Sequence, residues 1–401
     1  MSYQPLPALP IEFRLAIACC GWAFSGEDAA HVRELSGGVN WGAFLATCRR
    51  HRVQGLAWHA LHKLDVPVPG PVRVALAGDA RAISEHGLKA AREAARLADA
   101  FRAADIAMIF LKGLAVSKLA YGDPFLKMSS DIDILVQAHE LAPAAALLVR
   151  LGCRLIEPAD AAALLRWHSL RKDSVWRNGD GLIVELHGRV ADQEQVLPAF
   201  GVESTTQRVS VASNFELTTF ADEELFAYLC VHGTAHNWSR LKWLADLGAM
   251  LGRRTPDEIA QLYDAARACS VGRCAAVALL LCRRLLGLAL PERLVRALEQ
   301  DRVARALVQN ALAGLAYRKG TFELRPYTWP WVRMMMAQFF VGSGGAHGLH
   351  QLRTVWNSPG DRAQVALPRG FEFGYHLLRV PLWLGRVSRR TWAALGRSSL
   401  S

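Results

Sequence analysis

The chain has 401 residues, of which 52% are hydrophobic and 21% are charged, and this composition supports a folded core and excludes general disorder. Its length favours two or more domains over a single small core. The formal net charge of +11 favours anionic partners such as nucleotides, nucleic acid or phospholipid, although a general preference for Arg over Lys would also produce it.

The cysteines and the hydrophobic runs indicate the compartment. The eight cysteines form no CxxC pair and no His/Cys cluster at zinc spacing, and most lie in apolar runs, so we expect reduced thiols. The N-terminus has no basic stretch followed by an apolar one, and Arg283 and Arg284 interrupt the longest apolar run, residues 275–291. These features predict a soluble cytoplasmic protein without a signal peptide.

The first half of the chain changes from helices to alternating helices and strands. Residues 11–104 carry apolar side chains at helical spacing and predict an N-terminal helical segment, assigned to residues 1–104. Residues 106–111 predict a first strand, and Gly113 opens a helix that runs to about Tyr121. Residues 131–136 predict a second strand, and residues 138–150 a further helix.

A hairpin and a helical region follow. Residues 173–177 and 182–187 flank Asn178-Gly-Asp-Gly181, in which glycines can supply the positive φ that a tight turn requires. Residues 190–220 are rich in turn-forming and β-prone residues, and helical spacing resumes at Asp222. The expected fold class is α+β, with a small mixed sheet at 105–220 between the helical segment and a mainly helical domain at 221–401.

Two aspartates on the second predicted strand indicate a metal site. Asp131 and Asp133 alternate with Ile132 and Ile134, so a strand would place both carboxylates on one face and both isoleucines on the other. Like charges on one face repel, and a divalent cation relieves this repulsion because Mg²⁺ binds carboxylate and phosphate oxygens. We therefore predict that Asp131 and Asp133 bind Mg²⁺, with Mn²⁺ as the alternative ion.

The predicted hairpin supplies further polar groups. Glu185 and His187 share one face of its second arm, while Val184 and Leu186 face the core. On a neighbouring strand, Glu185 would complete a set of three carboxylates that serves nucleotidyl transfer, two holding metal and the third helping to deprotonate an acceptor hydroxyl. The alternative for these residues is an ordinary polar strand face.

Four stretches, in order, resemble an uncharacterised bacterial nucleotidyltransferase family within the superfamily that shares the DNA-polymerase-β palm fold. The resemblance extends over about residues 40–380, and its specific motifs lie within 110–250. The superfamily usually has Gly-Ser or Gly-Gly at the phosphate-binding turn, whereas this chain has Lys-Gly, as the close family characteristically does. The four stretches are Leu111-Lys-Gly-Leu-Ala115, Lys127-Met-Ser-Ser-Asp-Ile-Asp-Ile-Leu-Val136, Val184-Glu-Leu-His187 and His232-Gly-Thr-Ala-His-Asn-Trp-Ser-Arg-Leu-Lys-Trp-Leu-Ala-Asp246.

The resemblance implies a palm-type sheet and a metal-dependent transfer of a nucleoside monophosphate, most readily AMP, from a nucleoside triphosphate to an acceptor. The acceptor would be a hydroxyl or phosphate of a small molecule, sugar or peptide, and pyrophosphate would leave. Asp131, Asp133 and Glu185 would be both the catalytic residues and the metal ligands. The residues expected to bind the nucleotide are Lys112, Gly113, Lys127, Ser130, His187, His236, Arg240 and Lys242.

Other interpretations remain open at this stage. The Lys112-Gly113 turn is compatible with a non-catalytic binding or regulatory protein that keeps the palm fold. The positive charge suggests an RNA-modifying enzyme, but the basic residues are scattered, so nucleic acid is not the expected partner. Residues 371–390 are basic and aromatic, which suggests either peripheral contact with an anionic membrane or a terminal helix packed on the second domain.

Overall fold

The computed structural model describes residues 9–21, 28–213, 215–316, 329–342, 347–349 and 351–352, together with four single residues, Val365, Gly374, Leu378 and Pro381. The predicted membrane-contact segment, residues 371–390, lies outside this part of the chain apart from three of the single residues, so that contact stays a prediction. None of the helices that the structure describes is both long enough and apolar enough to cross a membrane. All eight cysteines lie in the described part and are free thiols, seven of them buried.

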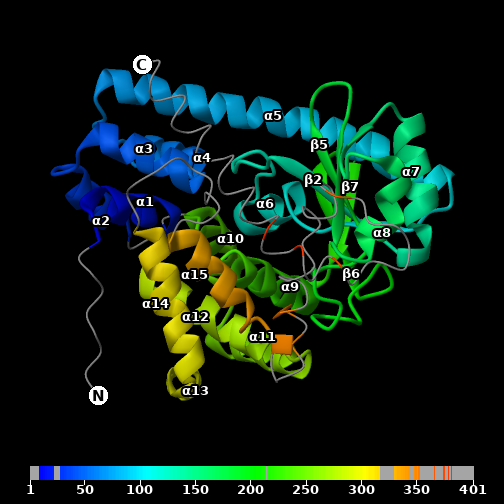
Figure 1. Cartoon of the computed structure of the whole chain (residues 1–401). Coiled ribbons are helices and arrows are strands. Elements are labelled where there is room, and N and C mark those ends of the chain that lie inside the picture. Colours follow the sequence, from blue (N-terminus) through cyan, green and yellow to red (C-terminus); the bar gives the residue numbers. More distant parts are fainter. Residues whose placement is uncertain are drawn as a thin grey trace.

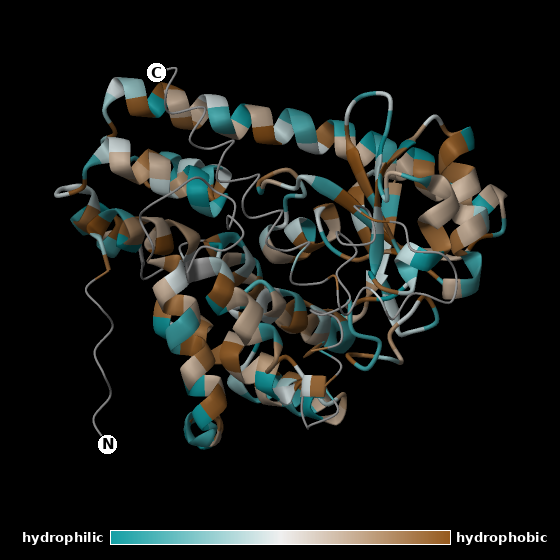
Figure 2. Ribbon diagram, in the orientation of Figure 1, coloured by the Kyte–Doolittle hydropathy of each residue, from teal (hydrophilic) through white to brown (hydrophobic). Residues whose placement is uncertain are grey.

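The N-terminal segment is helical, as predicted. Its last helix, α5, is 34 residues long and runs from the side of the N-terminal helices to the sheet, where it contacts β2 and α7 (Figure 1). Hydrophilic and hydrophobic bands alternate along α5 (Figure 2), as expected of a helix that buries one stripe. The segment consists of α1 (Ile11–Gly21), α2 (Asp28–Ser36), α3 (Trp41–His51), α4 (Gln54–Lys63) and α5 (Gly70–Ala103).

A five-stranded mixed sheet follows, with the order β1-β2-β5-β4-β3. The central pair β2 and β5 is parallel, and every other neighbouring pair is antiparallel. The α+β class, the second strand and the hairpin are thus confirmed. The strands are β1 (Met108–Phe110), β2 (Asp131–Val136), β3 (Arg154–Glu157), β4 (Asp173–Arg177) and β5 (Ile183–His187).

Shorter elements connect and flank these strands. The helix predicted after Gly113 is α6, and the helix predicted at 138–150 is divided into a 3₁₀ turn and α7. A separate two-stranded hairpin packs on β1 through β7. These elements are α6 (Leu114–Tyr121), η1 (Ala138–Glu140), α7 (Leu141–Arg150), η2 (Ala161–Ala163), α8 (Leu164–His168), β6 (Thr206–Ala212) and β7 (Phe215–Phe220).

The sheet has one apolar and one polar face at its centre. Ile132, Ile134, Val184 and Leu186 are at most 6% exposed and join the hydrophobic cluster that α5 and α7 contribute to. The alternate residues of β2 and β5 therefore lie on the opposite face. The period-2 pattern of the sequence thus determines which side of the sheet carries the carboxylates.

Helices resume at Asp222, as predicted, and helices from both ends of the chain share one hydrophobic cluster. Leu15 of α1, Phe44 of α3, Leu244 of α10 and Leu279 of α12 are fully buried in it. The division into three domains stays a prediction. The C-terminal helices are α9 (Asp222–Ala235), α10 (Leu241–Leu251), α11 (Pro256–Ala268), α12 (Gly272–Leu286), α13 (Glu292–Gln300), α14 (Arg302–Leu315) and α15 (Trp329–Gln338).

One expected helix is interrupted. The spacing of His236, Arg240 and Lys242 is compatible with one helix that presents all three, but α9 ends before His236 and α10 begins after Arg240. Asn237 and Trp238 between them have positive φ values of 50° and 46°. The buried Trp238 indole packs over the backbone of α9, where a Cβ on Gly233 would lie 2.4 Å from it.

Candidate metal and nucleotide site

Three carboxylates meet on the polar face of the sheet. Asp131 and Asp133 lie on β2, and the parallel register pairs Asp133 with Glu185 on β5. Residues aligned across adjacent strands have Cβ atoms about 5 Å apart and on the same face. The predicted proximity of Glu185 to the aspartates is therefore present.

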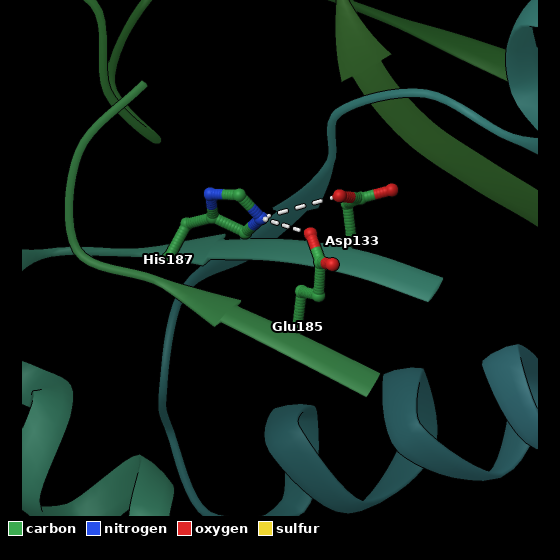
Figure 3. A group of neighbouring side chains, drawn as sticks. All are labelled: Asp133, Glu185 and His187. Carbon is green, nitrogen blue, oxygen red and sulfur yellow. Dashed lines mark hydrogen bonds and ion pairs between the residues drawn. The ribbon is translucent and has the colours of Figure 1, made fainter. Parts of the chain in front are cut away.

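His187 lies beside these carboxylates. Its Nε2 is 3.2 Å from Asp133 Oδ1 and 3.5 Å from Glu185 Oε2 (Figure 3). Because ionised carboxylates only accept hydrogen bonds, Nε2 carries the hydrogen and donates it to Asp133. The imidazole is 0% exposed, so its position suits orienting the two carboxylates.

The donor set fits a divalent cation. One ligand atom each from Asp133, Glu185 and His187 lies within 4.8 Å of the others, the one such group in the described part of the chain. With a hydrogen on His187 Nε2, the two carboxylates are the members of this group that can bind the ion. Asp133 Oδ2 is buried and has no hydrogen-bond partner among the described residues, which is costly for a carboxylate oxygen and fits a bound cation. Asp131 lies two residues earlier on the same face, outside this compact set, and its side chain is 22% exposed.

Burial and the local charges shift the pKa values of the two central carboxyl groups, Asp133 and Glu185, in opposite directions. Burial alone would raise the pKa of Asp133, but the Lys112 ammonium and the His187 hydrogen bond outweigh it and hold that pKa well below its usual range. Burial raises the pKa of Glu185, and the neighbouring Asp133 charge adds to the rise while His187 opposes it. Asp133 is thus firmly ionised, and Glu185 is the better proton acceptor of the two.

Lys112 contacts the aspartates directly. Its Nζ is 2.8 Å from Asp133 Oδ1 and 3.7 Å from Asp131 Oδ2. Burial opposes the charge on Lys112, but the three carboxylates more than compensate, and its pKa lies well above the usual value. The sequence predicted that Lys112 binds phosphate, and in the structure its ammonium neutralises the carboxylates.

Gly113 forms the turn between β1 and α6. Its φ of 74° and ψ of −121° lie in a region that side-chain-bearing residues rarely adopt. A Cβ at this position would also lie 3.0 Å from Ser129 Oγ, and Ser129 in turn donates a hydrogen bond to the carbonyl of Asp131. The turn therefore brings the N-terminus of α6 close to the backbone of Asp131.

Lys127 and Ser130 have protein partners. The Lys127 ammonium forms a buried ion pair with Asp246 of α10, which also accepts a hydrogen bond from Tyr121. Ser130 Oγ accepts a hydrogen bond of 3.0 Å from Arg52 Nη1, at the end of α3. Lys127 is thus engaged away from the carboxylates, and Arg52 is a cation near Ser130 that the sequence did not single out.

The residues predicted from the fourth motif differ in charge. Burial, followed by the nearby lysine charges, lowers the pKa of His236 to about 3, so its ring is neutral at pH 7. Burial and the neighbouring Lys127 lower the pKa of Lys242 to about 7. His236, His232 and Trp243 form an aromatic cluster with ring centroids 4.7–5.6 Å apart, which offers flat apolar surface more than charge.

Three polar residues missed by the sequence lie near the carboxylates. Lys172 Nζ is 2.7 Å from Asp173 Oδ2, and Asp173 is the register partner of His187. Tyr228 of α9 is 1% exposed and its hydroxyl has no partner; burial raises its pKa, against the nearby charge of Lys112. Extending the register of the predicted hairpin would have placed Asp173 here, whereas no local signal identifies Tyr228.

Comparison with known proteins identifies one family. A family model described as an uncharacterised nucleotidyltransferase matches residues 37–287, which is more than half of the chain. This match contains the complete sheet, α9, α10 and every candidate site residue described above. No curated protein matches the chain.

Proposed function

Since the chain belongs to this family of uncharacterised nucleotidyltransferases, we propose that it transfers a nucleoside monophosphate, most readily AMP, to an acceptor and releases pyrophosphate. The acceptor would be a hydroxyl or phosphate on a small molecule, sugar or peptide. The observations that carry the proposal are the close grouping of ligand atoms from Asp133, Glu185 and His187, and the buried Asp133 Oδ2, which has no hydrogen-bond partner among the described residues.

Each residue of the site has a proposed role that agrees with its surroundings. Asp131, Asp133 and Glu185 would hold a divalent ion, Mg²⁺ or Mn²⁺, which supplies charge neutralisation for the triphosphate and the leaving pyrophosphate. Glu185, with its raised pKa, would take the proton from the acceptor hydroxyl. His187 would keep Asp133 and Glu185 in position through its two contacts.

The triphosphate would lie beside the turn at Gly113, where backbone N–H groups at the start of α6 favour an anion. Lys112 and Arg52 would bring positive charge to this region, Lys242 would add to it when protonated, and Ser130 offers a hydroxyl. The aromatic cluster of His232, His236 and Trp243 provides rings on which a nucleobase could stack.

The test uses the purified protein with labelled nucleoside triphosphates, Mg²⁺ and a panel of acceptors, and records both nucleotide binding and pyrophosphate release. We expect binding to require the metal, and Glu185→Gln to lower turnover by about 10²- to 10⁴-fold, the usual contribution of a general base. Asp133→Asn should abolish metal-dependent binding. Asp180→Asn, an exposed carboxylate on the turn of the same hairpin, is the matched control.

A non-catalytic palm-fold protein is the second candidate, favoured by the ion pair between Lys112 and Asp133. It predicts that nucleotide binding is absent or independent of metal. Binding by Asp133→Asn equal to that of the wild type, with and without Mg²⁺, would support this candidate and exclude the metal-dependent transferase.

A further inference from the structure

The contact between Lys112 and the aspartates has a consequence for the order of binding. We propose that Lys112 is an exchangeable counter-ion, which neutralises the carboxylates in the nucleotide-free protein and transfers to the polyphosphate when a nucleoside triphosphate binds. The divalent ion then binds tightly only together with the nucleotide. This inference rests on the proposed function, because it assigns the metal to the same carboxylates.

The carboxylates need a cation in the absence of metal. Asp131, Asp133 and Glu185 carry three negative charges on adjacent positions of one sheet face, and the Asp133 side chain is 0% exposed. Water cannot screen charges at such a position. Lys112 Nζ, 2.8 Å from Asp133 Oδ1, supplies positive charge to this arrangement beside the hydrogen bond from His187.

The same ammonium opposes a metal ion. Lys112 directs its charge to Asp133 and Asp131, two of the three proposed metal ligands, so a divalent ion there must overcome the repulsion or displace the lysine. The ion would be drawn to Asp133 Oδ2, which has no partner among the described residues. Lys112 would then have to leave Oδ1 at a small cost in free energy. A lysine suits such an exchange because its charge is compact and its stem is flexible.

A new partner for the displaced ammonium is available next to the turn. Gly113 follows Lys112 directly and precedes the N-terminus of α6, where an anion is favoured. A polyphosphate bound there would offer oxygens to Lys112 and draw the ammonium off Asp133. Because coupling between two ligands is reciprocal, metal and triphosphate would each raise the affinity for the other.

The experiment measures Mn²⁺ binding by electron paramagnetic resonance in the nucleotide-free protein, in which the signal of free Mn²⁺ falls as the ion binds. We expect Lys112→Met to bind Mn²⁺ about tenfold or more tightly than the wild type, within the usual range of coupling between ligands. Lys112→Arg keeps the charge and should bind Mn²⁺ as weakly as the wild type. Circular dichroism and a melting curve show whether each variant is folded.

The matched control is Lys172→Met. Lys172 is the other lysine near Glu185, but its ammonium lies 2.7 Å from Asp173 and not on the aspartates of β2. The Lys172→Met variant shows how much Mn²⁺ binding is strengthened by the loss of any nearby positive charge. Lys112→Met should exceed this control several-fold, and equal effects would reduce Lys112 to a general contributor of charge and overturn the exchange.

A second arm separates this inference from the proposed function. Equilibrium dialysis of a labelled, non-hydrolysable ATP analogue with Mg²⁺ should show wild-type binding, with about tenfold weaker binding by Lys112→Met. If the analogue and Mn²⁺ both bind the wild type but Lys112→Met leaves the two affinities unchanged, the exchange is wrong and the transferase stands. If the wild type binds neither, separately or together, both fail.

Discussion

Two lysine–aspartate pairs lie within the same half of the molecule and differ in their surroundings. Lys127 and Asp246 are 7% and 5% exposed, and the Tyr121 hydroxyl, 3.1 Å from Asp246 Oδ1, adds a further contact. In the pair of Lys112 and Asp133, the lysine side chain is 18% exposed, and the buried carboxylate keeps one oxygen without a partner among the described residues. Both members of the first pair thus have their contacts within the protein, whereas Asp133 of the second pair can still bind a further ligand.

This difference distinguishes a lysine with a structural role, Lys127, from one with a proposed functional role, Lys112. Lys127 connects the segment before β2 to α10 through its ion pair with Asp246. This contact needs no ligand to be complete. Lys112 lies among more carboxylates than one lysine can neutralise. A buried ion pair is by itself weak evidence for either role, whereas an unsatisfied oxygen within the pair indicates a missing ligand.

The largest effect is expected from breaking the ion pair between Lys127 and Asp246. Lys127→Met leaves Asp246 as an uncompensated buried charge, and removing one partner of such a pair costs about 3–5 kcal/mol of the free energy of unfolding. Lys112→Met should cost less, because His187 still donates a hydrogen bond to Asp133 and the Asp131 and Glu185 side chains are 22% and 21% exposed to water. Urea denaturation of both variants measures the difference.

Asp246→Asn added to Lys127→Met should recover most of the loss, because it removes the stranded charge. An equal loss of stability in the two lysine variants would contradict the distinction between the pairs.

The turn beside Lys112 provides a smaller perturbation. Gly113→Ala forces a side-chain-bearing residue into a backbone conformation with φ 74° and a Cβ contact of 3.0 Å, and such strain costs about 1–3 kcal/mol. The melting temperature should fall, and nucleotide affinity should fall with it because the turn holds Lys112 next to Asp133. Gly122→Ala, at φ 75° and ψ −7° with open space around the Cβ, is the control for an alanine in the more accessible left-handed region and should cost less.

The smallest expected effect concerns a buried lysine without an ion-pair partner in the described part of the chain. The pKa of Lys242 falls from 10.5 to about 7 on folding, so burial of the charged form is unfavourable below pH 7. Between pH 7 and 10.5 the folded state has lost this proton while the unfolded state retains it, and stability therefore rises with pH. Lys242→Met should be more stable than the wild type at pH 6 by at least roughly 1.4 kcal/mol, the equivalent of one pKa unit.

This advantage of Lys242→Met should shrink as the pH rises from 7 towards 10.5. Lys89→Met, on the exposed side of α5, serves as the control and should show no such trend. Melting curves across this pH range decide the matter, and a stability difference that stays constant would show that Lys242 keeps its charge on folding.

The sequence predicted the sheet and the carboxylates because both depend on short-range patterns. Alternation over residues 131–136 determines the faces of β2, and the Asn178-Gly-Asp-Gly181 turn determines the hairpin that carries Glu185. The resemblance to a family then indicated that the two strands are neighbours. Their parallel register, with Asp133 opposite Glu185, agrees with that expectation.

The remaining features depend on contacts between distant segments. Lys127 meets Asp246 across 119 positions, and Arg52 reaches Ser130 across 78, so no local pattern reveals either contact. The break between α9 and α10 arises because Trp238 packs over Gly233, which helical spacing alone does not predict. The position of Lys112 on Asp133 likewise depends on the backbone at Gly113, which only the folded turn defines.

The shared register of β2 and β5 restricts how the length of this chain can vary. Asp133 and Glu185 face each other only because each strand keeps its phase, so deleting one residue between Asp131 and Asp133 would turn one aspartate to the apolar side. Under the proposed function, loops and helices that contact an acceptor would carry no comparable constraint. New acceptor preferences can therefore arise by insertion and deletion around the sheet, while its two central strands tolerate substitution alone.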